Sequence, residues 1–172
     1  MTNKVAVLVT DMVEDVELTS PKKALEQAGY QLVLIEKEAG KKITGKQGTT
    51  FVIDAAIDQV KPEDFVALLL PGGYSPDQLR ADERFVAFTK YFLENNRPLF
   101  AICHGPQLFI QTGSTANRTL TAYTTVQKDL EYAGATVKDE PVVIDQQVIT
   151  SRNPDDLPAF NRAIVELLTN EQ

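Results

Sequence analysis

Residues 98–106 read Pro-Leu-Phe-Ala-Ile-Cys-His-Gly-Pro. The apolar run over residues 98–102 has the length of a strand that is buried on both faces of a sheet. A small residue, Ala101, stands two positions before Cys103, and Gly105 stands two positions after it. Small residues at these positions let a strand and a helix approach closely, as in a nucleophile elbow. The stretch therefore predicts a strand that turns sharply into a short helix and holds the thiol above the sheet edge.

Apolar runs of strand length alternate with helical patterns along the rest of the chain. Strands are expected over residues 5–9, 32–35, 65–70, 142–144 and 147–150, and residues 51–53 are interpreted as a hairpin or paired edge segment. Further helices are expected over residues 82–94, 125–133 and from about residue 155 onward. The first helix is predicted to open with Ser20 as its N-cap and Pro21 at its first position. The alternation predicts βαβ units in a single α/β domain over residues 1–172, with a mostly parallel sheet.

Polar or glycine-rich turns follow three of the predicted strands, at residues 10–17, 71–77 and 103–106. In parallel sheets of this kind, ligands bind outside the carboxyl ends of the strands. We therefore expect these three turns to converge on one site although they are far apart in the sequence.

Cys103 is the only cysteine of the chain, and His104 is its only histidine. A thiol at a helix N-terminus is stabilised as the thiolate by the helix dipole and by free backbone N–H groups, which predicts a lowered pKa. His104 is a candidate proton acceptor beside it. The alternative is a small buried hydrophobic residue with no chemical role. The elbow pattern favours the functional interpretation.

The turn after the third predicted strand contains Gly72 and Gly73. These residues could simply form a turn. Beside an elbow, however, glycine lets backbone N–H groups come close to a substrate oxygen. We therefore interpret Gly72, Gly73 and the amide of His104 as a candidate oxyanion hole.

The segment Val-Glu-Asp-Val-Glu over residues 13–17 is acidic and contains no glycine, so the fingerprint of a dinucleotide site is absent at this turn. One of its carboxyl groups could reach the thiol from the neighbouring strand. A buried glutamate has a raised pKa, so it could keep its proton and donate a hydrogen bond to the sulfur. An ordinary acidic loop and helix start is the alternative.

Composition limits the possible partners and locations. The net charge is −7 with scattered basic residues, which argues against nucleic acid as a main ligand. No apolar run approaches the roughly 20 residues that span a bilayer, so no membrane association is expected. The start shows no signal-peptide pattern and a single cysteine allows no internal disulfide, so we expect a cytoplasmic protein. One cysteine and one histidine make no credible zinc site, so we expect no metal and no cofactor.

Four stretches together carry a family resemblance, namely residues 13–18, 70–73, 101–107 and 150–160. They resemble the PfpI intracellular protease family of the parkinsonism-associated deglycase superfamily, and the chain looks closest to the bacterial general stress proteins of that family. The resemblance covers essentially the whole chain. It implies a flavodoxin-like fold of the class I glutamine amidotransferase type, with helices on both faces of the sheet.

The resemblance also assigns roles to individual residues. It makes Cys103 the nucleophile and His104 its partner, and it matches Glu14 to the protonated glutamate beside the sulfur. Asp77 falls where family members carry an acidic residue that orients the histidine of a neighbouring subunit, which implies self-association as a dimer or hexamer. Tyr123 falls where related proteins place a tyrosine near the pocket, and a plain packing role for it is an equal alternative.

The resemblance implies a stress-response enzyme that acts on reactive carbonyls, as a glyoxalase on methylglyoxal or as a deglycase on glycated protein. In this mechanism the Cys103 thiolate attacks an aldehyde carbon and forms a hemithioacetal. Two alternatives stay open: an intracellular cysteine peptidase, and a redox-sensing stress chaperone in which Cys103 is oxidised to a sulfinate without turnover.

Overall fold

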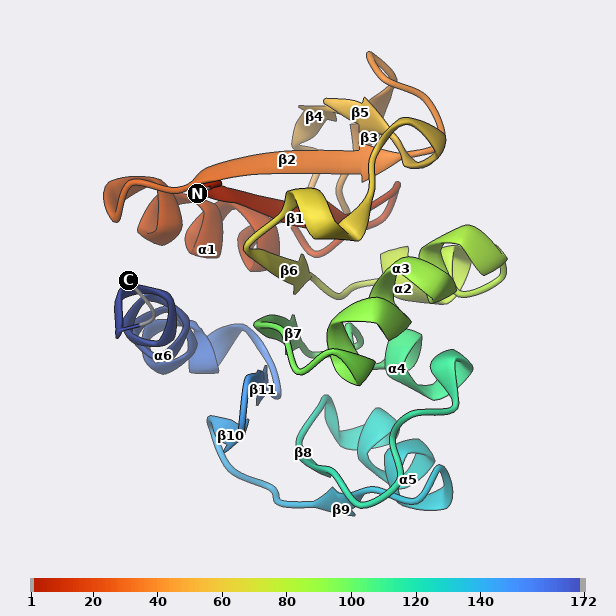
Figure 1. Cartoon of the computed structure of the whole chain (residues 1–172), viewed down its shortest axis with the longest axis vertical. Coiled ribbons are helices and arrows are strands. Elements are labelled where there is room, and N and C mark those ends of the chain that lie inside the picture. The colour runs from red at the N-terminus through yellow and green to blue at the C-terminus, as the bar shows by residue number, and fades with distance from the viewer. Residues whose placement is uncertain (1, 171–172) are drawn as a thin grey trace.

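The computed structural model describes residues 2–170. A seven-stranded sheet runs through its middle, in the order β10-β11-β7-β6-β1-β2-β5 (Figure 1). Its strands are β1 (Lys4–Leu8), β2 (Gln31–Glu36), β5 (Ala55–Ala56), β6 (Ala67–Leu70), β7 (Leu99–Ile102), β10 (Val143–Asp145) and β11 (Val148–Ser151). All neighbouring strands pair in parallel except β10 and β11, which form an antiparallel hairpin at one edge. The prediction of a mostly parallel sheet is therefore confirmed.

Helices cover both faces of this sheet (Figure 1). Two long helices, α1 (Asp15–Gln27) and α6 (Leu157–Asn170), lie side by side on one face. The other face carries α2 (Ser75–Leu79), α3 (Glu83–Glu94), α4 (Gln107–Thr112) and α5 (Thr124–Tyr132). The flavodoxin-like arrangement with helices on both faces is thus present as expected.

The central strands supply side chains to two separate hydrophobic cores, because successive residues of a strand point to opposite faces. In β7, Leu99 and Ala101 join the core under α3 and α4, whereas Phe100 and Ile102 join the core under α1 and α6. Burial on both faces explains why these strands read as continuous apolar runs in the sequence.

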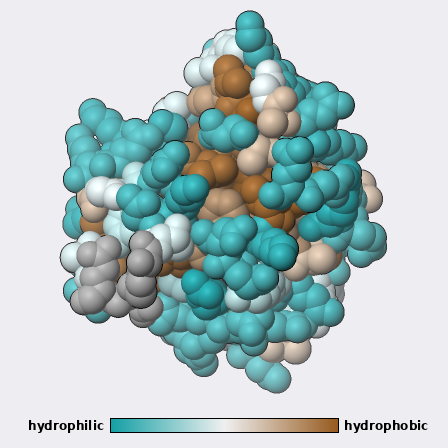
Figure 2. Space-filling model, turned by 45° about the horizontal axis from the view of Figure 1, so that its top comes forward, coloured by the Kyte–Doolittle hydropathy of each residue, from teal (hydrophilic) through white to brown (hydrophobic). Residues whose placement is uncertain are grey.

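Shorter elements complete the fold. An antiparallel hairpin is formed by β3 (Lys42–Thr44) and β4 (Thr50–Val52), which confirms the hairpin interpretation of residues 51–53. A small parallel pair is formed by β8 (Thr119–Leu120) and β9 (Thr136–Val137), and single 3₁₀ turns lie at Ile57–Gln59, Pro62–Asp64 and Pro154–Asp156. Hydrophilic side chains cover most of the face shown in Figure 2, and apolar side chains gather in a hollow near its middle. No helix within residues 2–170 has the length and apolar character needed to cross a bilayer.

The start of the first helix differs from the prediction. The helix begins at Asp15, not after Ser20, and Pro21 lies inside it. Proline removes one backbone N–H from a helix and disfavours its interior. Here, however, Leu18, Pro21 and Leu25 are buried on one side of α1, and this packing outweighs the loss. The acidic residues 15–17 therefore form the first turn of a helix, which determines where their side chains point.

Candidate active site

Cys103 occupies a sharp turn between β7 and α4. Its backbone has a φ of 62°, a left-handed value that residues other than glycine rarely adopt. Two hydrogen bonds hold this conformation: the Cys103 N–H donates to the carbonyl of Ser151 at 3.0 Å, and the Tyr123 N–H donates to the carbonyl of Cys103 at 2.9 Å. A Cβ on Gly105 would collide with the carbonyl oxygen of Leu70. The left-handed backbone of Cys103 and the lack of room for a side chain at Gly105 are both typical of an elbow. They confirm the prediction.

The turns that follow β1, β6 and β7 meet around Cys103. Val13 and Gly73 pair through an isolated antiparallel bridge, which joins the first two turns. Beside them a pocket of about 330 Å³ opens. It is lined by Glu14, Glu17, Lys46, Gly73, Tyr74, Cys103, His104, Tyr123 and Pro154. The predicted convergence of the three turns is confirmed.

The carboxyl group beside the thiol belongs to Glu17, and the expectation of Glu14 in this place is wrong. Glu17 has no exposed surface, and its Oε1 accepts a hydrogen bond from the Gly72 N–H at 2.9 Å. The same carboxyl interacts with the Cys103 side chain. Apart from that sulfur, its Oε2 has no hydrogen-bond partner among the described residues. Burial raises the pKa of Glu17 to about 8, so the carboxyl keeps its proton at neutral pH.

Glu14 lies at the edge of the same pocket but faces the hairpin. Its Oε2 accepts a hydrogen bond from Gln47 Nε2 at 3.3 Å, and its Oε1 lies 3.9 Å from the ammonium of Lys46. Glu14 precedes the first residue of α1, whereas Glu17 stands in the first helical turn and points inward. The start of α1 at Asp15 is thus the physical reason for the correction.

The environment of the thiol differs from the predicted one. Burial raises the pKa of Cys103, and the negative charge of an ionised Glu17 raises it further, whereas the N–H groups of His104 and Gly73 lower it. The expected lowering of the thiol pKa is therefore wrong, because burial is the largest influence and acts whatever the charge of Glu17. A proton on Glu17 removes the repulsion and provides a donor to the sulfur, so the two groups share one proton-dependent equilibrium.

Two of the three predicted oxyanion donors face the sulfur. The backbone N–H groups of Gly73 and His104 are directed toward Cys103. The third, the N–H of Gly72, is already bound to Glu17 and is not free for a substrate oxygen. A Cβ on Gly72 would lie 2.6 Å from Glu17 Oε1 and 2.9 Å from the His104 nitrogen, so Gly72 instead lets the glutamate approach.

His104 contacts the thiol from the other side. Its Nδ1 lies 3.3 Å from the Cys103 sulfur. Its ring stacks on that of Tyr123, with ring centres 4.8 Å apart and an angle of 23° between the planes. Burial lowers the pKa of His104, the nearby Lys46 lowers it further, and Asp77 opposes both. A neutral imidazole at neutral pH can accept the thiol proton.

Asp77 is exposed on α2 and makes no hydrogen bond to His104 within the described part of the chain. Its influence on the pKa of His104 shows that it lies near this ring. The structure holds one chain, so the contribution of Asp77 to a neighbouring subunit stays a prediction. Within residues 2–170, no group of three or more histidine, cysteine or acidic side chains is arranged to hold a metal ion.

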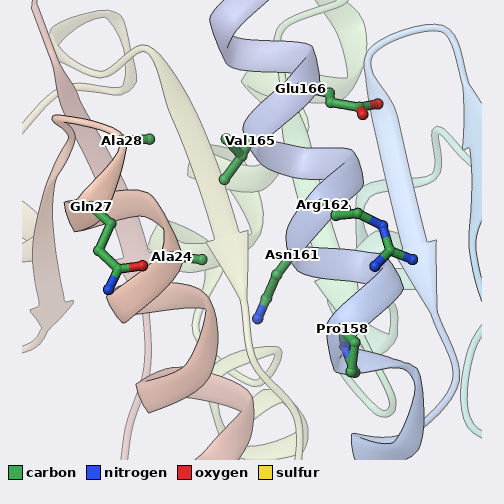
Figure 3. Close-up of a pocket in the computed structure, with 8 residues that line it drawn as sticks. All are labelled: Ala24, Gln27, Ala28, Pro158, Asn161, Arg162, Val165 and Glu166. Atoms are coloured by element: carbon green, nitrogen blue, oxygen red, sulfur yellow. The ribbon is translucent and has the colours of Figure 1, made fainter.

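A larger hollow of about 510 Å³ lies between α1 and α6. Figure 3 shows Ala24, Gln27 and Ala28 on its α1 side and Val165 and Asn161 on its α6 side, with Arg162 and Glu166 turned away from α1. Its lining contains no cysteine, serine, threonine or histidine side chain. We therefore assign the candidate active site to the smaller pocket around Cys103.

Comparison with known proteins identifies the family. The model of the DJ-1/PfpI family matches residues 3–167. The chain belongs to the DJ-1/PfpI family. Two *Bacillus subtilis* (strain 168) relatives are each 55% identical to it. YraA, a candidate cysteine protease by its name, aligns over 98% of this chain and 99% of its own length. General stress protein 18 aligns over the same shares of the two chains.

Solved structures of the family share the fold. A two-domain protein from *Anabaena variabilis* that contains DJ-1/ThiJ/PfpI-like and ferritin-like domains superposes with a TM-score of 0.93 and 35% identity, over 96% of this chain and 48% of that one. DJ-1 from *Schizosaccharomyces pombe* superposes with a TM-score of 0.86 and 20% identity, over 95% of this chain and 90% of that one. At 20% identity the likeness to the latter concerns the fold alone.

The sequence did not single out Glu17 and Lys46, which line the pocket, or Asp15, which lies beside it. Glu17 and Asp15 lie in the acidic segment over residues 13–17. The start of α1 must be known before one can tell which side chains of this segment are buried and which face solvent. Lys46 comes from the turn of the β3–β4 hairpin, which follows β2 and carries no motif. No sequence signal pointed to it.

Proposed function

We propose that this protein is a cysteine-dependent hydrolase or lyase that acts on small reactive carbonyl compounds such as methylglyoxal. One observation carries the proposal: the Cys103 sulfur faces a small pocket between a buried, protonated Glu17 and the directed N–H groups of Gly73 and His104. The pocket of about 330 Å³ suits a small molecule better than an extended peptide.

The first step is addition of the thiol to an aldehyde. The S–H proton passes to His104 Nδ1, which lies 3.3 Å away, while the sulfur forms a bond to the carbonyl carbon. The electron pair of the C=O bond moves onto the oxygen, where the N–H groups of Gly73 and His104 stabilise the negative charge. The imidazolium then returns its proton to this oxygen, which leaves a neutral hemithioacetal and a neutral His104.

With a 2-oxoaldehyde the reaction continues to a 2-hydroxy acid. His104, which is neutral again, removes the hydrogen of the former aldehyde carbon as a proton and delivers it to the adjacent carbon, while a second proton passes from the hydroxyl of the first carbon to the neighbouring ketone oxygen. The product of this shift is a thioester on Cys103. Water then attacks the thioester and releases the acid and the free thiol, so the sum is substrate plus one water. Glu17, which loses and regains its proton near pH 8, supports this transfer.

Two further functions have some support. A peptidase fits the name of YraA, although an extended cleft would be required. A redox role fits the name of general stress protein 18. Two equivalents of hydrogen peroxide would convert the thiol to a sulfinic acid with release of two waters, and the Glu17 O–H could donate to a sulfinate oxygen.

A steady-state assay separates these functions. Wild type and Cys103→Ser are compared on methylglyoxal, with formation of lactate as the readout, and on an unstructured peptide. The proposal predicts lactate formation by wild type and none by the variant. Cleavage of the peptide without formation of lactate would contradict the proposal and indicate a peptidase. If neither protein turns over a substrate but both prevent the aggregation of an unfolded protein, the proposal is wrong and a chaperone function is indicated.

We also propose a cytoplasmic homo-oligomer in which Asp77 approaches His104 of a neighbouring subunit. Exposed Tyr74 and Asp77 lie next to the pocket, where such a contact would form. Sedimentation of wild type and Asp77→Arg tests the assembly. A monomeric wild type would contradict it.

A further inference from the structure

The β3–β4 hairpin brings a single cation to the Cys103 pocket. Among the lining residues, all of which are described, Lys46 is the only lysine or arginine. Its ammonium lies 5.0 Å from the ring centre of Tyr74 and 3.9 Å from Glu14 Oε1, and its side chain is 31% exposed. The ion pair is long and half-open to solvent, so the ammonium is free to bind another anion at modest cost.

Asp15 fixes the tip of this hairpin. Its carboxylate is buried and accepts hydrogen bonds from two backbone N–H groups of the tip, that of Gln47 at 3.0 Å and that of Thr49 at 2.9 Å. The N–H of Lys46 itself donates to the carbonyl of Val13 at 2.9 Å. A Cβ on Gly45 would collide with the Asp15 carboxylate, so this close approach requires glycine. The first turn of α1 thus holds both Glu17 at the thiol and, through Asp15, Lys46 at the pocket.

The charge of Lys46 reaches the reacting groups. It lowers the pKa of both His104 and Glu17. At neutral pH, Glu17 is protonated and His104 is neutral, which leaves Lys46 and Glu14 as the charged side chains of the pocket. The Glu14 carboxylate already has one partner, because it accepts a hydrogen bond from Gln47. An anionic group that enters beside Cys103 therefore meets one ammonium and one carboxylate that is held toward the hairpin.

We propose that Lys46 is a specificity-determining residue that binds a carboxylate adjacent to the reacting carbonyl, and that Asp15 is the positioning residue that holds it there. The proposal rests on the proposed carbonyl chemistry for its ligand class: the hydroxy acid formed from a 2-oxoaldehyde, and small aldehyde acids that add to the thiol without further turnover. The claim that the charge of Lys46 attracts an anion to the Cys103 sulfur does not depend on turnover.

Alkylation of the single cysteine tests this electrostatic claim directly. Iodoacetate and iodoacetamide have nearly the same shape and differ in charge, so the ratio of their rates with Cys103 reports the local potential. The fraction of thiolate affects both rates equally and cancels in the ratio. Lys46→Gln should lower the ratio of iodoacetate to iodoacetamide rates by about fivefold, as expected for loss of one charge a few ångströms away in a partly solvated site.

Two matched variants sharpen this result. Lys46→Arg keeps the charge and should restore the ratio of wild type, whereas Glu14→Gln removes the opposing charge and should raise it. Raised salt should reduce all these differences. An unchanged ratio in Lys46→Gln, or the same loss in Lys46→Arg, would overturn the proposal.

The role of Asp15 requires a double-mutant cycle. Asp15→Asn keeps the shape of the side chain but can accept from only one of the two N–H groups with its oxygen. It should lower the alkylation ratio when Lys46 is present and leave it unchanged in a Lys46→Gln background. A purely structural effect would lower the ratio equally in both backgrounds, which would exclude a positioning role.

The ligand class is tested with glyoxylate as an inhibitor of glyoxal turnover. Glyoxylate can add to Cys103 as a hemithioacetal, but the carbon next to its aldehyde is a carboxylate and cannot accept the proton, so glyoxylate is not turned over. Lys46→Gln should raise the inhibition constant of glyoxylate by about fivefold, by the same electrostatic argument. An unchanged inhibition constant would contradict the inference and leave the proposed function intact. Absence of glyoxal turnover would contradict the proposed function, while the alkylation ratio would still decide the role of Lys46.

Discussion

The N–H of Gly72 donates to Glu17 Oε1 at 2.9 Å, and this bond fixes the acid beside the thiol. It links the turn after β6 to the first turn of α1, two segments that are distant in the sequence. It also removes the Gly72 amide from the candidate oxyanion hole. The roles of Glu17 and Gly72 are therefore set by one contact between them.

Substitution of this glutamate should abolish activity without loss of the fold. Glu17→Gln keeps an oxygen that accepts from Gly72, but it can no longer exchange a proton with the site. We expect kcat/KM for methylglyoxal to fall by roughly 10²-fold or more, the range of a general acid–base group. Glu14→Gln is the matched control and should change kcat/KM by less than about tenfold, since its carboxyl only adjusts the field at the pocket. Equal losses in both variants would contradict the assignment of Glu17.

The stability of the protein should depend on the proton of Glu17. Its pKa is about 8 in the folded chain and near 4.5 when solvated, so the folded state holds the proton more tightly. This contribution to stability is complete below pH 4.5 and is lost as the pH rises to about 8. Between pH 5 and 8, the free energy of unfolding of wild type should therefore fall relative to that of Glu17→Gln, by on the order of a few kcal/mol. Urea unfolding of both proteins at several pH values measures the difference, and parallel pH profiles would contradict it.

The elbow should not tolerate a side chain at Gly105. A Cβ there would collide with the Leu70 carbonyl oxygen, which belongs to a strand of the central sheet and cannot move away. We expect Gly105→Ala to lower the free energy of unfolding by about 3 kcal/mol or more, as for strong overpacking. Gly48→Ala is the control, because its Cβ meets no atom within 4 Å and only its φ of 95° is unfavourable. It should cost about 1 kcal/mol. Thermal unfolding of the two variants gives the comparison, and a smaller effect at Gly105 would argue against the close approach.

The ring of Tyr123 should position His104 by stacking. Tyr123→Phe keeps the stacked ring and should retain most of the activity, whereas Tyr123→Leu removes it. Stacked aromatic pairs contribute about 1 kcal/mol, so we expect Tyr123→Leu to lower kcat by roughly five- to tenfold. Because His104 is the only histidine, its titration can be followed by NMR without overlap. An unchanged titration and activity in Tyr123→Leu would assign Tyr123 a plain packing role.

Much of the fold was predictable because the central strands are buried on both faces. That burial requires runs such as residues 67–70 and 99–102 to be apolar throughout. Such runs can be recognised in the sequence without knowledge of tertiary contacts. The first helix was placed too late because Pro21 resembles a helix start in isolation. Only the packing of Leu18, Pro21 and Leu25 against the core shows that the helix continues through it.

The sequence by itself determined the α/β class, the strand that leads into Cys103 and the elbow around it, because these depend on local steric rules and on residues that are adjacent in the chain. The tertiary structure decided which acid faces the sulfur, which amide is free, and that a lysine of a distant hairpin joins the pocket. These depend on contacts between segments 30 or more residues apart, such as those of Asp15 with Gln47 and of Glu17 with Gly72. No local pattern encodes such contacts, since they form only when the chain is folded.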